Sequence, residues 1–168
     1  MKIDETMFTR PAMELAEYLA GKLLVRKRDG RIEKLRITET EAYLGENDTA
    51  SHAHKGRTAR TEPIYQQGGT IYVYLCYGIH NLINIAAAEA DCPECVLIRA
   101  CEGYEGPGKL TKRLGIDRTF NGKHILRCEE LWLEDDGVHF ETIKKPRVGI
   151  QYAQPEDVSR LCRFIVQR

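Results

Sequence analysis

Three apolar segments separated by short turns run from residue 70 to residue 101, and they constrain the fold more than any other stretch of the sequence. The segments are Thr70–Tyr77, Asn81–Ala88 and Cys95–Cys101. Each has the length and the β-branched or aromatic content that is typical of a strand. Gly78 marks the first turn, and Asp91-Cys92-Pro93 marks the second. The pattern therefore predicts three successive β-strands.

The rest of the chain holds more strand signals than helix signals. An amphipathic pattern capped by Thr9 predicts a helix over residues 9–24, and the run Lys109–Leu114 after Gly106-Pro107-Gly108 predicts a short one. Further strands are predicted at Lys22–Arg26, Ile32–Ala42, Leu131–Leu133, Arg147–Tyr152 and Cys162–Val166, the first two joined by the turn Arg28-Asp29-Gly30. The polar segment 45–69 is predicted to be a long loop, and such loops are often functional. We expect a single α+β domain over residues 1–168, built around a curved antiparallel β-sheet with a few flanking helices.

Length and composition favour a soluble globular protein. The chain has 168 residues, of which 42% are hydrophobic and 30% charged. It has no apolar run of membrane-spanning length and no signal-peptide pattern at its start, so we expect a cytoplasmic protein with no membrane partner. The 25 basic and 25 acidic residues balance, which is mild evidence against a nucleic-acid partner. A local basic patch can still bind nucleic acid within a neutral total.

The six cysteines are expected to be free thiols, because a disulfide framework is unusual in a chain without a secretory signal. Cys92 and Cys95 have the two-residue spacing of a zinc or redox pair. The sequence contains no second pair of this kind, and His52 and His54 are the histidines that a motif could supply. We expect no metal, and a small zinc protein remains the alternative.

Glu41 is a candidate general base near the end of the predicted strand Ile32–Ala42. Period-two alternation places Glu39 and Glu41 on the same strand face. A solvated polar face explains such a pair, since most glutamates lie at the surface. A carboxylate that activates water explains Glu41 as well. The spacing alone leaves both interpretations open.

Three tyrosines gather in the predicted strand Thr70–Tyr77. Alternation places Tyr72 and Tyr74 on one face, opposite the aliphatic residues. Tyr77 precedes Gly78, where the strand can turn and swing the ring outward. Aromatic residues are good strand formers, which explains one or two of these tyrosines better than it explains the cluster.

Polar residues interrupt two of the apolar strands. Asn84 lies within an aliphatic run and Arg99 follows another. A buried amide must find hydrogen-bond partners, and a charge on an apolar strand has a high cost unless it is paired. His52 lies in the long loop among small residues, where it could be held by the backbone or could pack flat against a ligand. These residues indicate a cleft.

Two basic clusters could bind phosphate. Lys109, Lys112 and Arg113 share one face of the predicted short helix, whose N-terminus is open to an anion. The second cluster lies in the long loop and consists of Lys55, Arg57 and Arg60. Solvated surface side chains are the alternative for each residue.

Taken together, these residues resemble the alkyladenine (3-methyladenine) DNA glycosylase family over most of the chain, in collinear order. The matching segments are Glu39-Thr40-Glu41-Ala42-Tyr43-Leu44-Gly45, His52, Gly69-Thr70-Ile71-Tyr72-Val73-Tyr74, Tyr77-Gly78, Asn84-Ile85, Val96-Leu97-Ile98-Arg99-Ala100, Gly106-Pro107-Gly108-Lys109-Leu110 and Arg147-Val148-Gly149. Two departures affect expected contacts to the DNA backbone: the short connection between Glu102 and Gly106, and the stretch Arg60-Thr61-Glu62-Pro63.

The resemblance implies a role for each of the site residues. Glu41 would deprotonate the attacking water, aided by Arg99 and the main-chain carbonyl of Val148. Tyr43, His52 and Tyr74 would sandwich the flipped base, and main-chain groups near Ala50 and His52 would touch its edge. Tyr77 would fill the gap left in the duplex, and Asn84 would oppose the exocyclic amine of a normal guanine.

The resemblance also implies the activity. We expect a monomeric, monofunctional DNA glycosylase that excises alkylated or deaminated purines from double-stranded DNA, leaves an abasic site and needs no cofactor. A nucleic-acid-binding module of the same fold without catalysis remains an alternative. The joint presence of Glu41 and Arg99 argues against that alternative, because binding alone does not require this pair.

Overall fold

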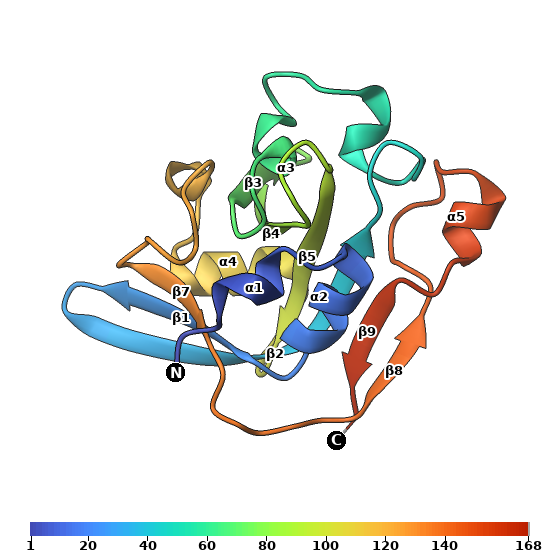
Figure 1. Cartoon of the computed structure of the whole chain (residues 1–168). Helices are drawn as coiled ribbons and strands as arrows, with labels where there is room; N and C mark the ends of the chain where they lie inside the picture. The colour runs from blue at the N-terminus through green and yellow to red at the C-terminus, as the bar shows by residue number, and fades with distance from the viewer. Residues whose placement is uncertain (168) are drawn as a thin grey trace.

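A curled antiparallel β-sheet forms the body of the protein (Figure 1). The computed structural model describes residues 1–167. Its strands are β1 (Leu23–Arg28), β2 (Arg31–Tyr43), β3 (Ile71–Cys76), β4 (His80–Ala87), β5 (Glu94–Cys101), β6 (Tyr104–Glu105), β7 (Leu131–Glu134), β8 (Thr142–Lys145) and β9 (Arg163–Val166). They pair in the order β3-β4-β5-β2-β1-β7, β6 adds to β5, and β9 pairs with both β2 and β8. The predicted α+β class and curved antiparallel sheet are confirmed.

The long strand β2 joins the two parts of the sheet. Its first half forms a hairpin with β1, and its second half lies between β5 and β9. The register with β5 shifts on both sides of Glu39. Such irregularities bend a strand and increase its twist, so β2 can serve both parts of a curled sheet. The bend also brings Glu39 and Glu41 to the region where the two parts meet.

Helix α2 (Ala12–Leu19) packs on strands β2 and β5, and helix α4 (Pro107–Leu114) packs on strands β4 and β5. The helices are α1 (Glu5–Phe8), α2 (Ala12–Leu19), α3 (Glu62–Tyr65), α4 (Pro107–Leu114) and α5 (Pro155–Ser159), with short 3-10 turns at His52–Lys55 and Arg118–Phe120. The apolar stripe of α2 is fully buried at Ala12, Leu15, Ala16 and Leu19. The Thr40 hydroxyl donates a hydrogen bond of 2.7 Å to the Ala16 carbonyl and so fixes α2 against β2. No helix among residues 1–167 is long and apolar enough to span a membrane.

The predicted helix over residues 9–24 is wrong at both ends. Thr9 ends α1 instead of capping a longer helix, and Pro11 is the N-cap of α2. The helix is interrupted because a residue before proline disfavours the α conformation. At the other end the chain turns at Gly21, whose φ of 95° lies in the left-handed region. Most of the predicted amphipathic pattern therefore belongs to the eight residues of α2.

The predicted strand Arg147–Tyr152 is also wrong. This segment is irregular, and the strand that pairs with β9 is β8, which ends at Lys145, two residues before the predicted strand would begin. Arg147 has a fully buried side chain committed to an ion pair, and Gly149 has a φ of 74°. Neither condition suits a strand residue. The other predicted strands are present with ends shifted by one or two residues.

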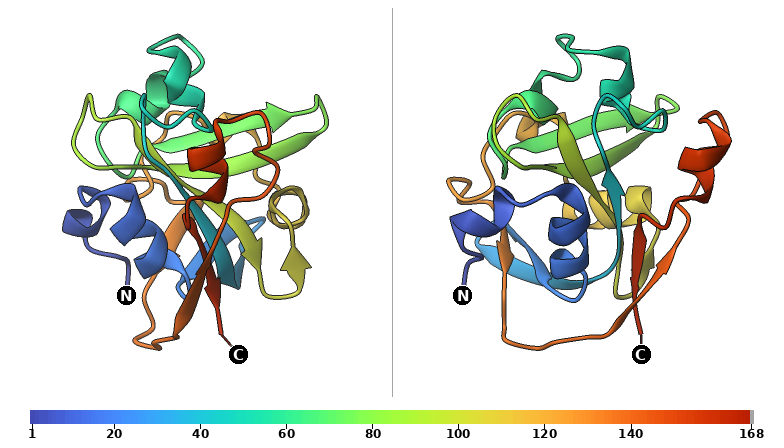
Figure 2. Two further views of the ribbon diagram at one scale, coloured as in Figure 1. Left: turned by 90° about the vertical axis from the view of Figure 1, so that its right-hand side faces the viewer. Right: turned by 45° about the vertical axis from the view of Figure 1, so that its right-hand side comes forward.

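The β3–β4 hairpin reaches away from the body of the molecule, as the left view of Figure 2 shows. Its turn contains Tyr77 and Gly78, both with positive φ. Beside it, β6 leads directly into α4, which packs against β4. The polar segment 45–69 is mostly irregular, as predicted, but includes α3 and a 3-10 turn that begins at His52. These features surround one cleft.

Candidate active site

Glu41 is a buried carboxylate at the centre of the cleft. Its side chain is 1% exposed, and Oε1 lies 3.0 Å from Nε of Arg99. Oε2 accepts hydrogen bonds of 3.3 Å from the Val148 main-chain N–H and from the Tyr43 hydroxyl. Burial raises the pKa of Glu41 to about 7, while Arg99, the Val148 N–H and the Tyr43 hydroxyl oppose that rise. A carboxyl group with a pKa near neutral pH is suited to proton transfer.

Arg99 is placed on β5 beside the same strand face. Its Nε also lies 3.8 Å from Oε2 of Glu39, which in turn accepts a hydrogen bond of 3.3 Å from Arg163. Although Nε of Arg99 is close to both carboxylates, it makes no well-aligned hydrogen bond within the described residues. Its effect on Glu41 is therefore mainly coulombic. The short distance between Arg99 and Glu41 agrees with the prediction that these two side chains lie together.

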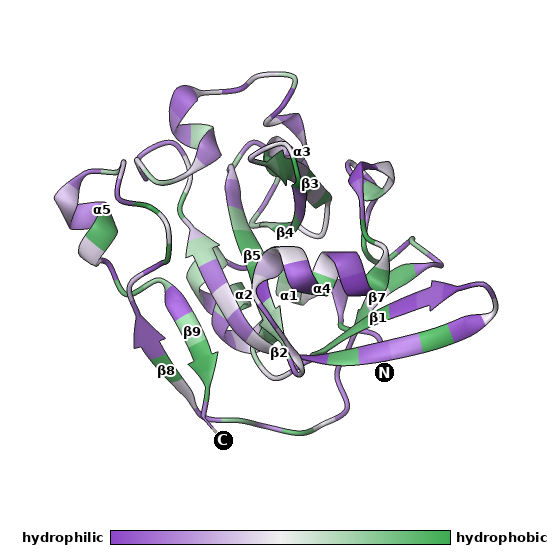
Figure 3. Ribbon diagram, turned by 180° about the vertical axis from the view of Figure 1, so that it is seen from behind, coloured by the Kyte–Doolittle hydropathy of each residue, from purple (hydrophilic) through white to green (hydrophobic). Residues whose placement is uncertain are grey.

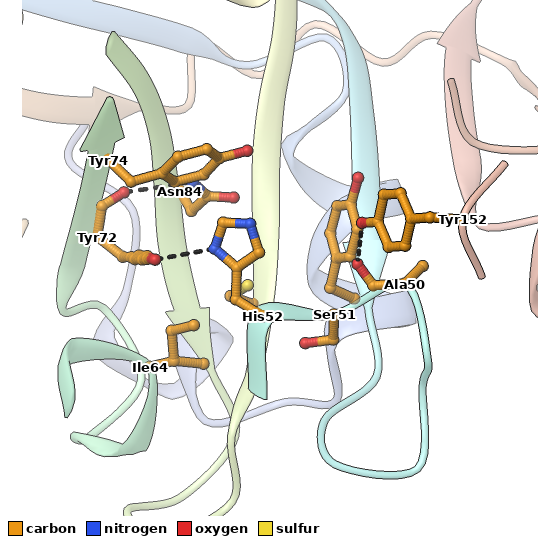
Figure 4. A pocket seen from close by; sticks show the side chains of 10 residues that line it. Ala50, Ser51, His52, Ile64, Tyr72, Tyr74, Asn84 and Tyr152 are labelled. Carbon is orange, nitrogen blue, oxygen red and sulfur yellow. Dashed lines mark hydrogen bonds between the residues drawn. The ribbon is translucent and has the colours of Figure 1, made fainter. Parts of the chain in front are cut away.

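Aromatic rings from separate elements line a recess (Figure 4). The His52 ring centroid is 4.5 Å from that of Tyr74 at an interplanar angle of 63°, and Nδ1 of His52 is 2.9 Å from the Tyr72 hydroxyl. Burial, followed by the charges of Arg60 and Lys55, lowers the pKa of His52 to about 4. The His52 ring is therefore neutral at physiological pH. Burial, together with the charge of Glu41, raises the pKa of Tyr43, which keeps its hydroxyl protonated as a donor.

The recess and the carboxylate belong to one connected cavity system. A cleft of about 360 Å³ is lined by Glu41 and Arg99, and it shares four rings with the recess, those of Tyr43, His52, Tyr74 and Tyr152. This volume lies within the range of roughly 300–1,000 Å³ typical of small-molecule sites. The fold thus places stacking surfaces and a carboxylate of raised pKa side by side.

Asn84 and Tyr77 lie at opposite extremes of exposure. The Asn84 side chain is buried against the recess, where its amide donates a 3.3 Å hydrogen bond to the Tyr72 carbonyl. Tyr77 is 91% exposed at the tip of the β3–β4 hairpin and lines the outer edge of the cleft. The predicted outward swing of Tyr77 at Gly78 agrees with this position.

The candidate phosphate-binding residues fall into two groups. Arg57 pairs with both Glu62 and Asp91, and Arg113 pairs with Glu33, so these two arginines are engaged within the protein. The other four are exposed and form no ion pair with another described residue: Lys55, Arg60, Lys109 and Lys112. Arg60 lies over the recess, 5.8 Å from the Tyr74 ring.

A buried ion pair that the sequence did not reveal supports the site from behind. Arg147 donates to both carboxylate oxygens of Asp48, and both side chains are fully buried. The same guanidinium donates to the Ala42 carbonyl and lies 4.8 Å from the Tyr43 ring. Asp48 accepts in addition from the main-chain N–H groups of Leu44 and Ala50. The pair thus joins the end of β2 to the loop and to the segment that carries Val148.

Tyr152 is a second pocket residue that sequence analysis missed. Its hydroxyl donates a 2.7 Å hydrogen bond to the Ala50 carbonyl, as Figure 4 shows. The predicted strand Arg147–Tyr152 concealed this role, because strand alternation says nothing about an irregular segment that folds back over the pocket. An isolated tyrosine gave no signal that could have identified it.

The zinc alternative has no supporting geometry. Cys92 is exposed, whereas Cys95 is buried and lines the aromatic recess. Burial raises the pKa of the Cys95 thiol to about 12, so the free thiol stays protonated. Within residues 1–167, no three histidine, cysteine or acidic side chains are grouped as a metal site.

Comparison with known proteins places this site in a family. The sequence profile of the methylpurine-DNA glycosylase family matches residues 6–105 and 103–168. The break between the two matched segments coincides with the short connection between Glu102 and Gly106. Three similar proteins carry the name "Putative 3-methyladenine DNA glycosylase". The one from Psychrobacter cryohalolentis is 44% identical over 90% of this chain and 85% of its own.

The other two relatives are matched over nearly their whole length. The Borreliella afzelii protein is 39% identical over 98% of this chain and 96% of its own. The Methanocella arvoryzae protein is 40% identical over 96% of this chain and 90% of its own. The family profile matches both segments of the chain, and the relatives are similar over most of its length. The chain therefore belongs to the methylpurine-DNA glycosylase family of DNA glycosylases.

Proposed function

We propose that this protein hydrolyses the N-glycosidic bond of alkylated or deaminated purines in double-stranded DNA and leaves an abasic site. One observation carries the proposal: the carboxylate of Glu41 is buried beside a recess of aromatic rings, with a pKa raised to about 7. One chain contains the whole site, so a monomer suffices.

Base flipping brings the substrate to this site. A purine in the duplex is shielded from water by its neighbours, and extrusion costs a few kcal/mol, least for a damaged base. The exposed ring of Tyr77 at the hairpin tip is suited to fill the vacated space. The extruded base stacks among Tyr43, His52 and Tyr74, with its glycosidic bond at the Glu41 end of the cleft.

Glu41 then acts as the general base. Its ionised form accepts a proton from a water molecule as the water attacks the sugar carbon, and the glycosidic electrons leave with the base. Arg99 stabilises the ionised carboxylate by charge, and the Val148 N–H holds one of its oxygens. The Val148 carbonyl accepts a hydrogen bond from the attacking water, while the N–H of the same residue donates to Oε2 of Glu41.

The lining of the recess favours cationic purines. N-alkylated purines carry a positive charge, and each electron-rich ring stabilises a cation by roughly 0.5–2 kcal/mol. His52 is neutral at physiological pH and adds no competing charge. A cationic base also departs without protonation. A neutral lesion such as hypoxanthine needs additional leaving-group help, so we expect its excision to be slower.

The side chains around the base support a monofunctional mechanism. Among the described residues, neither the recess nor the Glu41 cleft is lined by a lysine. An amine that could form a Schiff base with the sugar is therefore missing from the position where it would act. Water activated by Glu41 is the nucleophile, and the DNA strand stays intact.

The test uses duplexes that each hold one lesion: 3-methyladenine, 7-methylguanine, hypoxanthine or ethenoadenine. Strand cleavage should occur only after treatment with alkali, and Glu41→Gln should lower the single-turnover rate by about 10²–10⁴ while lesion binding survives. Cleavage without alkali would contradict the monofunctional mechanism. Binding without release of any base would indicate a nucleic-acid-binding module instead.

A further inference from the structure

Four arginines surround a cavity of about 410 Å³ away from the active site. Arg26, Arg28 and Arg31 come from the β1–β2 hairpin, and Arg113 comes from the last turn of α4. We call this cavity the arginine pocket. It also contains the carboxylates of Asp29 and Glu33, so positive charge is in excess. Figure 3 shows the hydrophilic end of the hairpin projecting beside α4.

Arg26 is the structural base of the arginine pocket. It is 8% exposed, and its Nε donates a 3.1 Å hydrogen bond to the Leu114 carbonyl at the end of α4. Its Nη1 donates to the Glu130 carbonyl at 3.1 Å, and its guanidinium lies 4.8 Å from the Phe120 ring. These contacts fix the hairpin against the end of α4, so the pocket has a rigid floor.

Arg28 and Arg31 are the unpaired cations of the arginine pocket. They are opposite each other in the hairpin register, both are exposed, and neither forms an ion pair with another residue of the described chain. A Cβ placed on Gly115 would overlap Nη1 of Arg28, so this guanidinium lies directly over the end of α4. Like charges held close together repel one another, and an anion between them relieves that repulsion.

Helix α4 connects the arginine pocket to the active site. Its first residue, Pro107, lines the cleft that contains Glu41, and its last residue, Leu114, lines the arginine pocket. Eight helical residues span about 12 Å. Between these ends, Lys112 and the exposed Ile79 of the β3–β4 hairpin line another cavity. The exposed Lys109, Lys112 and Arg113 of α4 thus form a basic strip that runs from the cleft to the β1–β2 hairpin.

We propose that the arginine pocket binds backbone phosphates of the DNA duplex on one side of the flipped purine. The proposal rests on the proposed function and adds a contact outside the candidate active site. Phosphates follow one another at about 3.4 Å per nucleotide along the helix axis, so about 12 Å corresponds to three or four nucleotides. Guanidinium groups bind phosphate oxygens through paired hydrogen bonds, which suits Arg28 and Arg31.

The test compares Arg28→Ser/Arg31→Ser with Lys144→Ser/Lys145→Ser. The control removes two positive charges from β8, which is outside the strip. Affinity for a lesion duplex of roughly 20 base pairs is measured at several salt concentrations. The salt slope is the steepness with which the logarithm of the binding constant falls with the logarithm of the salt concentration, and each lost phosphate contact lowers it by about 0.9. We expect the arginine variant to lower the slope by about 1–2 and the control to leave it near that of the unmodified protein.

Shortening the duplex provides a second readout. Removing the base pairs beyond the second position on one side of the lesion should weaken binding by the unmodified protein but not by the arginine variant. Shortening the other side should affect both equally. Arg28→Lys/Arg31→Lys should restore most of the salt slope, which separates loss of charge from misfolding.

The outcomes distinguish this inference from the proposed function. If the unmodified protein releases lesions but the arginine variant matches the control in slope and in length dependence, the arginine pocket does not bind DNA. If Arg28→Lys/Arg31→Lys binds DNA as weakly as Arg28→Ser/Arg31→Ser and has a lowered melting temperature, the two arginines stabilise the fold and do not bind DNA. If the unmodified protein neither binds nor excises lesions, the proposed function itself fails.

Discussion

Replacing Glu41 with glutamine should make the protein more stable at neutral and alkaline pH while lowering the excision rate by about 10²–10⁴. The Glu41 side chain is 1% exposed, so its ionised form has lost almost all contact with water. Arg99, the Val148 N–H and the Tyr43 hydroxyl compensate only in part, because the net pKa is still raised to about 7. Active-site residues that are unfavourable for folding commonly show this trade-off between stability and activity.

The magnitude follows from the difference between the folded and unfolded pKa. The folded value of about 7 lies some 2.5 units above the ordinary value of 4.5. At about 1.36 kcal/mol per unit, ionised Glu41 destabilises the folded state by roughly 3 kcal/mol. Arg99 loses its partner in the variant, which offsets part of the gain, but Glu39 remains 3.8 Å away.

The pH dependence has a definite sign. Below about pH 4.5, Glu41 is protonated in both states and the two proteins differ only by a constant. Between about pH 4.5 and pH 7, the carboxyl ionises in the unfolded chain alone, so the unmodified protein loses stability relative to Glu41→Gln. The difference should grow by about 1.4 kcal/mol per pH unit and level off above pH 7.

Urea denaturation of both proteins from about pH 4.5 to pH 8 measures this difference. Glu39→Gln is the matched control, because Glu39 is on the same strand face beside Arg99 but is partly exposed. We expect Glu39→Gln not to reproduce the change, because the Glu39 side chain is 24% exposed and pairs with Arg163 as well as with Arg99. A difference between Glu41→Gln and the unmodified protein that stays constant over this range would refute the reasoning.

Three further substitutions test other parts of the site. Tyr77→Ala should remove stacking worth on the order of 1–3 kcal/mol from the state in which the base is flipped out, so single-turnover excision should fall more for a paired lesion than for a mismatched one. Equal losses in both contexts would argue against the proposal that Tyr77 fills the vacated space. Arg147→Met should leave the buried Asp48 carboxylate unpaired and lower the free energy of unfolding by about 3–5 kcal/mol in urea titrations, and an unchanged midpoint would mean that the pair contributes little. Tyr152→Phe frees the Ala50 carbonyl to accept from an exocyclic amine, so the rate on 3-methyladenine should rise relative to hypoxanthine, with a melting temperature close to that of the unmodified protein. An unchanged ratio of the two rates would show that Tyr152 does not influence the choice of base.

Local patterns in the sequence were sufficient to predict most of the strands and the chemical candidates, but not β6 or β8. Alternation along β3 separated Tyr72 and Tyr74 from the aliphatic face, and Gly78 indicated where Tyr77 leaves the strand. Side chains alternate between the two faces of a strand with a period of two residues. This alternation depends only on neighbouring residues, so it can be recognised without knowledge of the fold. The same local logic failed over residues 9–24 and at Arg147–Tyr152, where proline, glycine and a buried ion pair override periodicity.

Only the tertiary structure decided what surrounds the chemical groups. Whether Glu41 is a solvated carboxylate or a buried one depends on β5, β9 and the Val148 segment, which approach it from far along the chain. The Asp48–Arg147 pair joins residues separated by 99 positions. The arginine pocket likewise exists only because the β1–β2 hairpin packs against the end of α4. Burial and the proximity of charges are properties of the folded chain as a whole. For this reason, residue type and spacing were enough to identify the candidate groups but not to predict their pKa values or their partners.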